Sequence, residues 1–386
     1  MKRFYWLTIV ALFSVLIGSS MVQAQSLFTV QAKSAILMDF DTGRILFEQD
    51  PEVKLLPASL VKIMNLYLAF DALKQGTITL DDKFTVSIKA WQPVGSKMFI
   101  KEGDQVPVDD LLKGIAIVSG NDACITMAEG IAGVTEVFVQ MMNDKAKDLG
   151  LVNTHFTDVH GLDDSSEQYT TALDIASLAR SYILNHPNAL EYHSTKEFTY
   201  NNITQRNRNG LLWTYSGVDG LKTGHLSKVG YNLVATAKQN NMRLIAVVLG
   251  ADSETIRENE VRKLLNYGFR NFETIKANDI VAPISTDVYK GKVKNIEVVP
   301  VENIAMLIPV GAKDQVRVVK NIKKPLVAPL KKGQAIGEFK FFWQDELLAS
   351  TKATVAEDVP KGGFFRVLWD SIRLFFAKIF SSKSNA

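Results

Sequence analysis

The chain has 386 residues, 47% of them hydrophobic and 22% charged, which is enough apolar material for one large domain and a smaller one. Its 44 basic and 41 acidic residues give a net charge of +3, which excludes the strong positive field of a typical nucleic-acid-binding protein. Cys124 is the single cysteine, so the chain cannot form an intramolecular disulfide. Because Cys124 lies in an apolar stretch, we expect a small buried residue there and not a catalytic thiol.

Residues 1–24 have the composition of a secretory signal. Lys2 and Arg3 precede the apolar run 4–17, and small residues lead to Ala24. The apolar run is shorter than the roughly 20 residues that a membrane-spanning helix needs, which disfavours an uncleaved anchor. We therefore predict cleavage after Ala24 and export of the mature protein.

The next segment, residues 25–279, is predicted to be a single α+β domain. It begins with a β-hairpin around the turn Asp41-Thr42-Gly43 and continues with mainly helical patterns from about residue 59 to about residue 185. Strands return near Lys222, and a second hairpin turns at Gln239-Asn240-Asn241. Early and late strands around central helices are typical of this fold class. The predicted strands of the two hairpins are residues 35–40, 44–47, 230–237 and 243–249.

The composition changes after about Ala277. Short runs rich in Val and Ile are interrupted at close intervals by Pro and Gly, which is typical of a small β-sandwich. We assign residues 280–358 to this β-rich domain and expect it to position the first domain or to bind a partner. It contains no histidine.

Residues 359–386 are predicted to form an amphipathic helix and a short tail, after the flexible pair Gly362-Gly363. Such a helix can dock on the protein's own core or lie in a lipid interface. The bulky aromatic side, the flanking basic residues and the terminal position favour attachment to a membrane surface. The apolar side comprises Phe365, Leu368, Ile372, Phe375, Phe376 and Ile379, and the opposite side Arg366, Asp370, Arg373 and Ala377.

The segment Ser59-Leu60-Val61-Lys62 carries the candidate chemistry. A serine needs a base to take its proton during nucleophilic attack, and residues three apart on a helix share one face. Lys62 can therefore reach the hydroxyl of Ser59 and act as that base, provided that burial or a second cation lowers its pKa. A backbone N–H at the start of the same helix is suited to stabilising an oxyanion.

Two further motifs follow in order, Ser119-Gly120-Asn121 and Lys222-Thr223-Gly224. With these three motifs the sequence resembles the low-molecular-mass penicillin-binding proteins that act as D-alanyl-D-alanine carboxypeptidases, in the penicillin-binding protein and β-lactamase superfamily. The resemblance covers nearly the whole chain, including residues 160–163 and 207–213. It implies a β-lactamase/transpeptidase-like domain with an antiparallel sheet and a helical cluster.

The resemblance implies a role for each motif residue. Ser59 would form the acyl-enzyme, Lys62 would be its base, and Ser119 would relay a proton to the leaving D-alanine. The substrate-binding residues would be Asn121 on the substrate amide, the wall Lys222, Thr223 and Gly224, the backbone N–H of His225 as an oxyanion donor, and Arg257 on the substrate carboxylate. From the residues themselves, Lys222 is a cation suited to a substrate that ends in a carboxylate, and an arginine fork suits the same group. His160 and His225 are expected to be packing or hydrogen-bonding residues.

The predicted activity is therefore that of a serine-type D-alanyl-D-alanine carboxypeptidase that acts on peptidoglycan pentapeptides and is acylated by β-lactams. It would work at the periplasmic face of the inner membrane, attached through its C-terminal helix, without a metal or cofactor. A class A β-lactamase is disfavoured, because those enzymes use a deacylating glutamate and generally have aspartate at the position of Gly120. A D,D-endopeptidase or a non-catalytic wall-binding protein could share the fold. A non-catalytic protein is disfavoured, because it would have no need to retain together the polar motif residues Ser59, Lys62, Ser119, Asn121 and Lys222.

Overall fold

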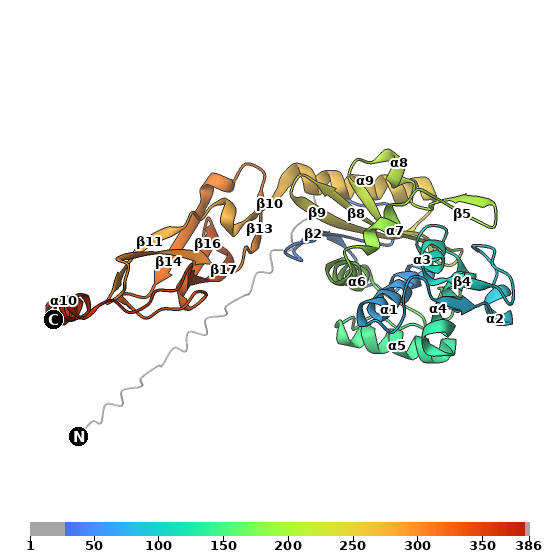
Figure 1. The fold of residues 1–386 in the computed structure, drawn as a ribbon. Helices are drawn as coiled ribbons and strands as arrows, with labels where there is room; N and C mark the ends of the chain where they lie inside the picture. The colour runs from blue at the N-terminus through green and yellow to red at the C-terminus, as the bar shows by residue number, and fades with distance from the viewer. Residues whose placement is uncertain (1–27, 383–386) are drawn as a thin grey trace, which may run out of the picture.

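The computed structural model describes residues 28–382, so the predicted signal segment 1–24 lies outside the described residues. Figure 1 shows two lobes in a row, with the last helix at the end farthest from the larger lobe. The larger lobe combines a sheet with helices, and the smaller lobe consists mainly of strands. The α+β class and the order of the parts agree with the sequence-based prediction.

A five-stranded antiparallel sheet forms the centre of the larger lobe. Successive residues of its middle strands point into different cores. Ile36 and Met38 lie in one hydrophobic cluster, while Ala35 and Leu37 lie in another on the opposite face. In spatial order the strands are β2 (Ile45–Gln49), β1 (Ser34–Asp39), β9 (Met242–Ala251), β8 (Gly230–Gln239) and β7 (Val218–Leu226).

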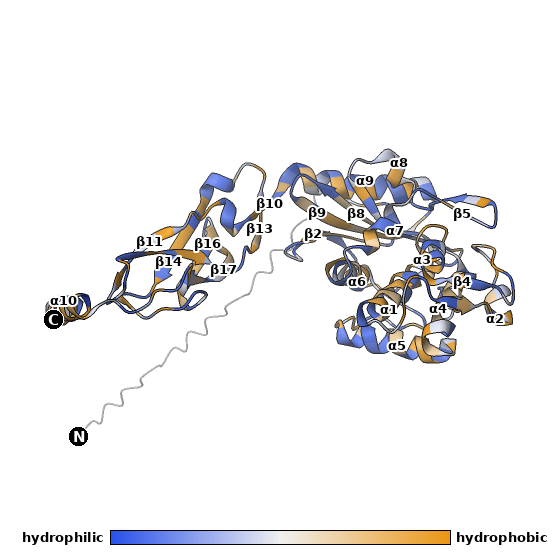
Figure 2. Cartoon of the chain, in the orientation of Figure 1, coloured by the Kyte–Doolittle hydropathy of each residue, from blue (hydrophilic) through white to orange (hydrophobic). Residues whose placement is uncertain are grey.

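Both predicted hairpins are confirmed: β1 pairs with β2, and β8 pairs with β9. Figure 2 shows the apolar residues concentrated along β8 and β9, as expected for strands covered on both faces. One face is covered by a helical cluster and the other by α9 (Glu254–Asn271), with α8 (Leu211–Thr214) beside it. The helical cluster comprises α1 (Val61–Gln75), α2 (Ile88–Trp91), α3 (Val108–Ala116), α4 (Asn121–Ala132), α5 (Thr135–Asp148) and α6 (Ala172–Asn185).

The predicted helical region is interrupted more often than its pattern suggested. Residues 149–171 form a long connection without a helix, held by hydrogen bonds such as Leu55 N to Thr170 O. Thr171 caps the start of α6, since its side chain accepts a hydrogen bond from the N–H of Asp174. The remaining elements of this lobe are α7 (Ala189–Ser194) and two short hairpins, β3 (Lys83–Thr85) with β4 (Gln105–Pro107) and β5 (Glu197–Tyr200) with β6 (Ile203–Arg206).

The smaller lobe has a six-stranded sheet and a two-stranded sheet that share one hydrophobic core. It is β-rich as predicted, but its first strand, β10, begins at Phe272, before the expected boundary at 279, because β10 pairs with β13. The two-stranded sheet is β10 (Phe272–Lys276) and β13 (Ala305–Pro309). The larger sheet is, in order, β14 (Val316–Ile322), β16 (Ala335–Trp343), β17 (Glu346–Val355), β12 (Asn295–Pro300), β11 (Ile284–Tyr289) and β15 (Leu326–Val327).

Polar contacts join the lobes, among them a backbone hydrogen bond of 3.0 Å from the N–H of Val310 to the carbonyl of Asn271 at the end of α9. The fully buried Asp39 accepts a hydrogen bond of 3.0 Å from the hydroxyl of Thr274 on β10. Arg44 forms a 3.2 Å ion pair with Glu346 on β17, and both side chains are about half exposed. The buried contact fixes the start of the second lobe against β1.

The last helix, α10 (Phe364–Ser382), contacts the smaller lobe through its polar side. The buried carboxylate of Asp370 accepts a hydrogen bond from the N–H of Lys290 at 2.6 Å and pairs with Arg366 at 3.0 Å. The predicted apolar side is exposed as far as Phe376, with Phe365 at 83% and Phe375 at 63%, and the side chain of Ile379 lies outside the described ones. The predicted helix is confirmed, and its apolar side does not pack on the protein's own core.

Among the described residues, no single helix is long and apolar enough to span a membrane. The bent pair α4 and α5 passes the same test of length and composition, with an angle of 86° between the two helices.

Candidate active site

Ser59 lies in a 3-10 turn, Ala58–Leu60, that leads directly into α1. The side chain is half-buried at the junction of the helical cluster and the sheet. Ala58 has a φ of +50°, a strained backbone conformation for a residue with a Cβ atom. Such strain persists where surrounding structure enforces it, and here it turns the chain sharply before Ser59.

Lys62 is completely buried beneath Ser59, one helical turn along the chain. Its Nζ lies 2.9 Å from Oγ of Ser59, 2.8 Å from Oδ1 of Asn121 and 2.5 Å from the carbonyl oxygen of His160. Burial lowers the pKa of Lys62 below its ordinary value, because the charged ammonium loses its hydration. The structure thus supplies the environment that the sequence could not reveal.

The second motif lies at the start of α4, on the helical side of the site. Ser119 is nearly buried and has a φ of +62°. The amide of Asn121 has both ends engaged: Nδ2 donates to the carbonyl of Val94 at 2.7 Å, and Oδ1 accepts from Lys62. The first contact fixes the amide orientation, so the oxygen and not the nitrogen faces Lys62.

A loop around Asp158 presents the His160 carbonyl to Lys62. The carboxylate of Asp158 accepts hydrogen bonds from the N–H groups of His160, Gly161 and Asp163, at 3.1, 2.5 and 2.7 Å. These contacts, together with the nearby His160 ring, hold the pKa of Asp158 far below its usual range despite its burial. Gly161 has a φ of +88° and lies directly against the backbone of Ala58. The loop therefore packs on the turn that carries Ser59.

Strand β7 forms the opposite wall of the site with the third motif. A Cβ atom on Gly224 would lie 3.2 Å from the backbone nitrogen of Ser59, so this strand approaches Ser59 closely. Thr223 is buried, and Lys222 is only 2% exposed. Burial, reinforced by the charges of Lys62 and two arginines, holds the pKa of Lys222 well below its usual value. The structure brings all three motifs together around Ser59.

For two predicted substrate-binding residues, His225 and Arg257, the structure shows contacts with neighbouring side chains but no contact with Ser59 or Lys62 among the described hydrogen bonds. The ring of His225 is exposed and stacks on Tyr231, with 4.1 Å between the ring centroids. The buried guanidinium of Arg257, on α9, pairs with Glu254 at 3.3 Å and Glu258 at 3.4 Å, and its Nε has no partner among the described residues. The predicted role of Arg257 as a carboxylate ligand stays a prediction.

The other predictions about individual residues can also be compared with the structure. Cys124 is completely buried, and burial raises the pKa of its thiol to about 12, which confirms a small core residue. His160 is a hydrogen-bonding residue, since its Nδ1 lies 3.2 Å from the N–H of Leu162. Within the described part of the chain, no group of three or more His, Cys, Asp or Glu side chains could hold a metal ion.

The glutamate spacing of class A β-lactamases, Glu-x-x-x-Asn, occurs once between Asn121 and Lys222, at Glu197 and Asn201. Glu197 begins β5, where its carboxylate forms a 3.2 Å ion pair with Arg206 on the neighbouring strand β6. Both partners are half exposed or more. Glu197 therefore takes part in a surface ion pair of a short hairpin, and its contacts do not join it to Lys62.

The sequence analysis missed Asp122, which follows the second motif. Its buried carboxylate accepts hydrogen bonds from the N–H groups of Met98 and Phe99, both at 2.9 Å. These bonds tie the segment after residue 94 to α4, next to Asn121. An acidic residue in the first turn of a helix is a signal for such capping, but it does not say which distant N–H groups will be bound.

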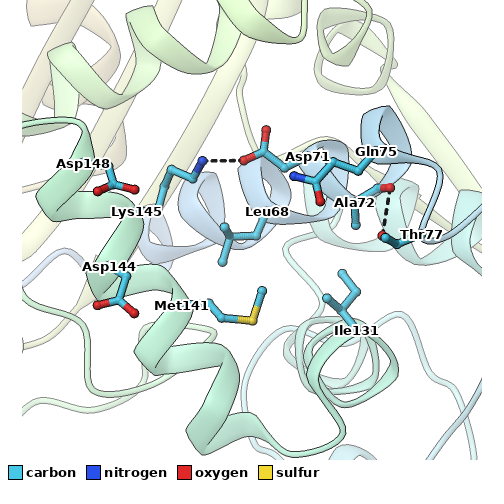
Figure 3. A pocket seen from close by; sticks show the side chains of 10 residues that line it. All are labelled: Leu68, Asp71, Ala72, Gln75, Thr77, Ile131, Met141, Asp144, Lys145 and Asp148. Atoms are coloured by element: carbon cyan, nitrogen blue, oxygen red, sulfur yellow. Dashed lines mark hydrogen bonds and ion pairs between the residues drawn. The ribbon is translucent and has the colours of Figure 1, made fainter.

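The surface also has a hollow of about 440 Å³ between α1 and α5, shown in Figure 3. It contains carboxylates, and Asp71 there pairs with Lys145 at 2.7 Å. Its one hydroxyl, that of Thr77, donates a hydrogen bond to the backbone oxygen of Ala72. None of the residues of the three motifs lines this hollow, so it is separate from the candidate active site at Ser59.

The fold and this cluster are those of a serine acyl-transfer enzyme. The chain belongs to the D-alanyl-D-alanine carboxypeptidase family, whose model matches residues 20–253. A model described as penicillin-binding protein 5, C-terminal domain, matches residues 269–361.

Individual proteins are similar over most of the chain. D-alanyl-D-alanine carboxypeptidase DacC of Escherichia coli (strain K12) is 44% identical over 363 residues, which is 92% of this chain and 90% of that protein. The crystal structure of penicillin binding protein 5 from Haemophilus influenzae is 41% identical, with a TM-score of 0.75, and covers 86% of this chain and 99% of that chain. Penicillin-Binding Protein D2 from Listeria monocytogenes, in the ampicillin bound form, is 29% identical with a TM-score of 0.59 and covers 64% of this chain and 100% of that chain.

Proposed function

We propose that Ser59 is the nucleophile of this protein, which is a serine-type D-alanyl-D-alanine carboxypeptidase that shortens peptidoglycan pentapeptides by one residue. The observation that carries the assignment is the buried Lys62, whose Nζ lies 2.9 Å from the hydroxyl oxygen of Ser59. Burial favours the neutral amine, which is the form that can accept a proton.

The partners of Lys62 support its action as a base. A neutral lysine has two N–H donors and one lone pair, and two of its three neighbours, the oxygens of Asn121 and His160, can only accept. The two N–H donors match these two oxygens. The lone pair then faces Ser59, so the serine hydroxyl donates to Lys62 and is ready to transfer its proton.

In the proposed reaction Oγ of Ser59 attacks the carbonyl carbon of the penultimate D-alanine, and the serine proton passes to Lys62. The amide C–N bond breaks, the nitrogen receives a proton through Ser119, and D-alanine leaves. Water then hydrolyses the ester and frees Ser59. The closely packed Gly224 supports a role for this part of β7 beside the oxyanion, because the strand lies next to the backbone nitrogen of Ser59.

Lys222 would select substrates that end in a carboxylate. Its ammonium is buried near the amine of Lys62, and both effects disfavour its charge in the free protein. An incoming carboxylate would restore the charged form by direct pairing. A β-lactam also carries a carboxylate beside its reactive amide, so we expect penicillin to acylate Ser59. The ampicillin-bound relative supports this expectation.

Two measurements test the assignment. The wild-type protein should release one D-alanine per molecule of a peptide that ends in D-Ala-D-Ala, and the mass of the penicillin-treated protein should rise by one penicillin. Ser59→Ala should abolish both signals, whereas Ser87→Ala, which removes a helix cap of α2, should retain them. Covalent labelling of Ser59→Ala would refute the nucleophile assignment, and labelling of wild type without D-alanine release would refute the carboxypeptidase activity.

We also propose that the mature protein works at the periplasmic face of the inner membrane, attached through α10. The supporting observation is that the helix is held by its polar side, with Asp370 buried against the N–H of Lys290, while the aromatic side is exposed. An outward apolar face with basic residues alongside is suited to a lipid interface.

Binding to vesicles of phosphatidylethanolamine and phosphatidylglycerol tests this attachment. A chain that ends at Lys361, or the double variant Phe365→Ser with Phe375→Ser, should sediment much less with the vesicles. Val152→Ser is the matched control, because Val152 is 83% exposed on the larger lobe, as exposed as Phe365. Equal sedimentation of the truncated and full chains would exclude α10 as the anchor.

A further inference from the structure

Strand β7, which carries the third motif, lies at the edge of the five-stranded sheet. One side of β7 pairs with β8, and no strand among residues 28–382 pairs with its other side. Backbone groups at such an edge normally bind water or a covering element. Gly220 and Leu221, which immediately precede Lys222, are nevertheless buried.

Two buried side chains satisfy the carbonyl groups of these residues. Nδ2 of Asn209 donates to the carbonyl oxygen of Gly220 at 2.9 Å, and Nδ1 of His193, at the end of α7, lies 2.8 Å from that of Leu221. A carbonyl oxygen can only accept, so Nδ1 of His193 carries the proton. Its Nε2 then accepts from the hydroxyl of Tyr182, at 3.2 Å.

The same segment reaches the opposite wall of the active site. Asn207 joins the two donors: Nδ2 donates to the backbone oxygen of His193 at 3.1 Å, and Oδ1 accepts from the N–H of Asn209 at 3.0 Å. Between them, the N–H of Arg208 donates to the carbonyl of Ile117, two residues before Ser119, at 3.3 Å. The segment 207–209 therefore links the backbone near Ser119 with the backbone before Lys222.

We propose that His193 and Asn209 are positioning residues that set the place of Lys222 relative to Ser59, an inference that rests on the proposed function. They act through the carbonyls of Leu221 and Gly220 and do not touch the substrate. Residues 207–213 resemble the family, but the sequence analysis gave them no role. The present inference gives residues 207–209 a role, as the segment that links the two walls of the site.

The side chain of Lys222 makes few hydrogen bonds of its own, so its position has to be set by the backbone that carries it. Its Nζ donates to the backbone oxygen of Thr223 at 3.1 Å, the single hydrogen bond that the described residues give it. The position of its ammonium therefore depends on the backbone of β7. His193 adds no competing charge, because burial lowers its pKa to about 3 and the ring stays neutral.

The test compares two acylating agents that differ only in a carboxylate, benzylpenicillin and its methyl ester. The wild-type chain should react much faster with the free acid, because Lys222 meets the carboxylate. His193→Leu and Asn209→Ala each remove one of the two donors, and each should reduce the ratio of the two acylation rate constants about tenfold. A displacement of about 1 Å costs roughly 100-fold in rate, and one donor remains in each variant. His193→Asn should retain most of the ratio, because its amide can place a donor near the position of Nδ1.

Two controls separate positioning from stability. Tyr182→Phe removes the hydroxyl that bonds His193 but leaves the bond to Leu221, so the ratio should stay high. His186→Asn changes another buried histidine, which bonds Asp71 at 2.8 Å and lies outside the active site. This variant should lower stability without changing the ratio.

The possible outcomes are distinguishable. A wild-type ratio near one would refute the proposed role of Lys222 itself. A high wild-type ratio that persists in folded His193→Leu and Asn209→Ala would overturn only the present inference. If His193→Leu fails to fold, Asn209→Ala decides the question alone, because it removes atoms without adding bulk.

Discussion

Replacing Gly161 with alanine should disturb the base without touching any reacting atom. The new Cβ would lie 1.9 Å from the backbone oxygen of Ala58, and real Cβ atoms keep at least 3.0 Å. The loop or the turn must therefore shift by about 1.1 Å, the difference between these distances. The carbonyl of the adjacent His160 binds Lys62, so the shift moves the base relative to Ser59.

The expected loss follows from this displacement. A misplacement of about 1 Å costs roughly 100-fold in rate, which corresponds to about 2.7 kcal/mol in the activation free energy. Alanine at the positive φ of +88° and the overpacking against Ala58 should together lower the free energy of unfolding by about 2–4 kcal/mol.

The assay is the rate constant for acylation by benzylpenicillin, measured together with urea unfolding. Gly150→Ala is the matched control, since Gly150 has a φ of +72° but no atom within 4 Å of the added Cβ. It should lose about 1 kcal/mol of stability and keep the wild-type rate. If Gly161→Ala acylated as fast as Gly150→Ala, the reasoning about the loop and Lys62 would be wrong.

Three further predictions concern charges. Lys62 and Lys222 have lower pKa values in the folded state than in the unfolded chain. Between the folded and unfolded pKa of each lysine the unfolded state binds more protons, so the free energy of unfolding should rise with pH across that range. Lys222→Met should flatten this rise in unfolding experiments at pH 7 to 10. Asp122→Asn keeps the shape but loses acceptors for backbone N–H groups, so chemical denaturation should show a loss of about 2–3 kcal/mol. Arg44→Ala breaks a half-exposed pair with Glu346 and should change the midpoint of unfolding very little, by less than about 0.5 kcal/mol, and a larger loss would show that this pair holds the lobes together.

The catalytic core of the site could be predicted from sequence because its chemistry depends on spacing within one helix. Ser59 and Lys62 are three residues apart, and the structure places their polar atoms at hydrogen-bond distance. The contact of Lys62 with residue 160 could not be predicted in this way. The His160 contact uses a backbone carbonyl, which every residue has, so no residue type marks it in the sequence.

The fold was also predictable where it depends on local sequence, and not where it depends on contacts between distant residues. The hairpins around Gly43 and Asn240 follow from local turn chemistry and alternating apolar residues, and both are present. The periodicity of α10 predicted the helix and its two sides, but not which side contacts the smaller lobe. That depends on Asp370 meeting the N–H of Lys290, a contact between residues 80 positions apart.

The complete enclosure of Lys62 has a consequence for the path of the proton. Among the described hydrogen-bond partners of its Nζ, the oxygens of Asn121 and His160 are an amide and a peptide carbonyl, which do not carry protons onward. The hydroxyl of Ser59 is the remaining described partner, and in the proposed reaction it is the source of the proton that Lys62 takes up at attack. If the proposed reaction is correct, the enclosed base holds this proton away from bulk water until it reaches the departing amine through Ser119.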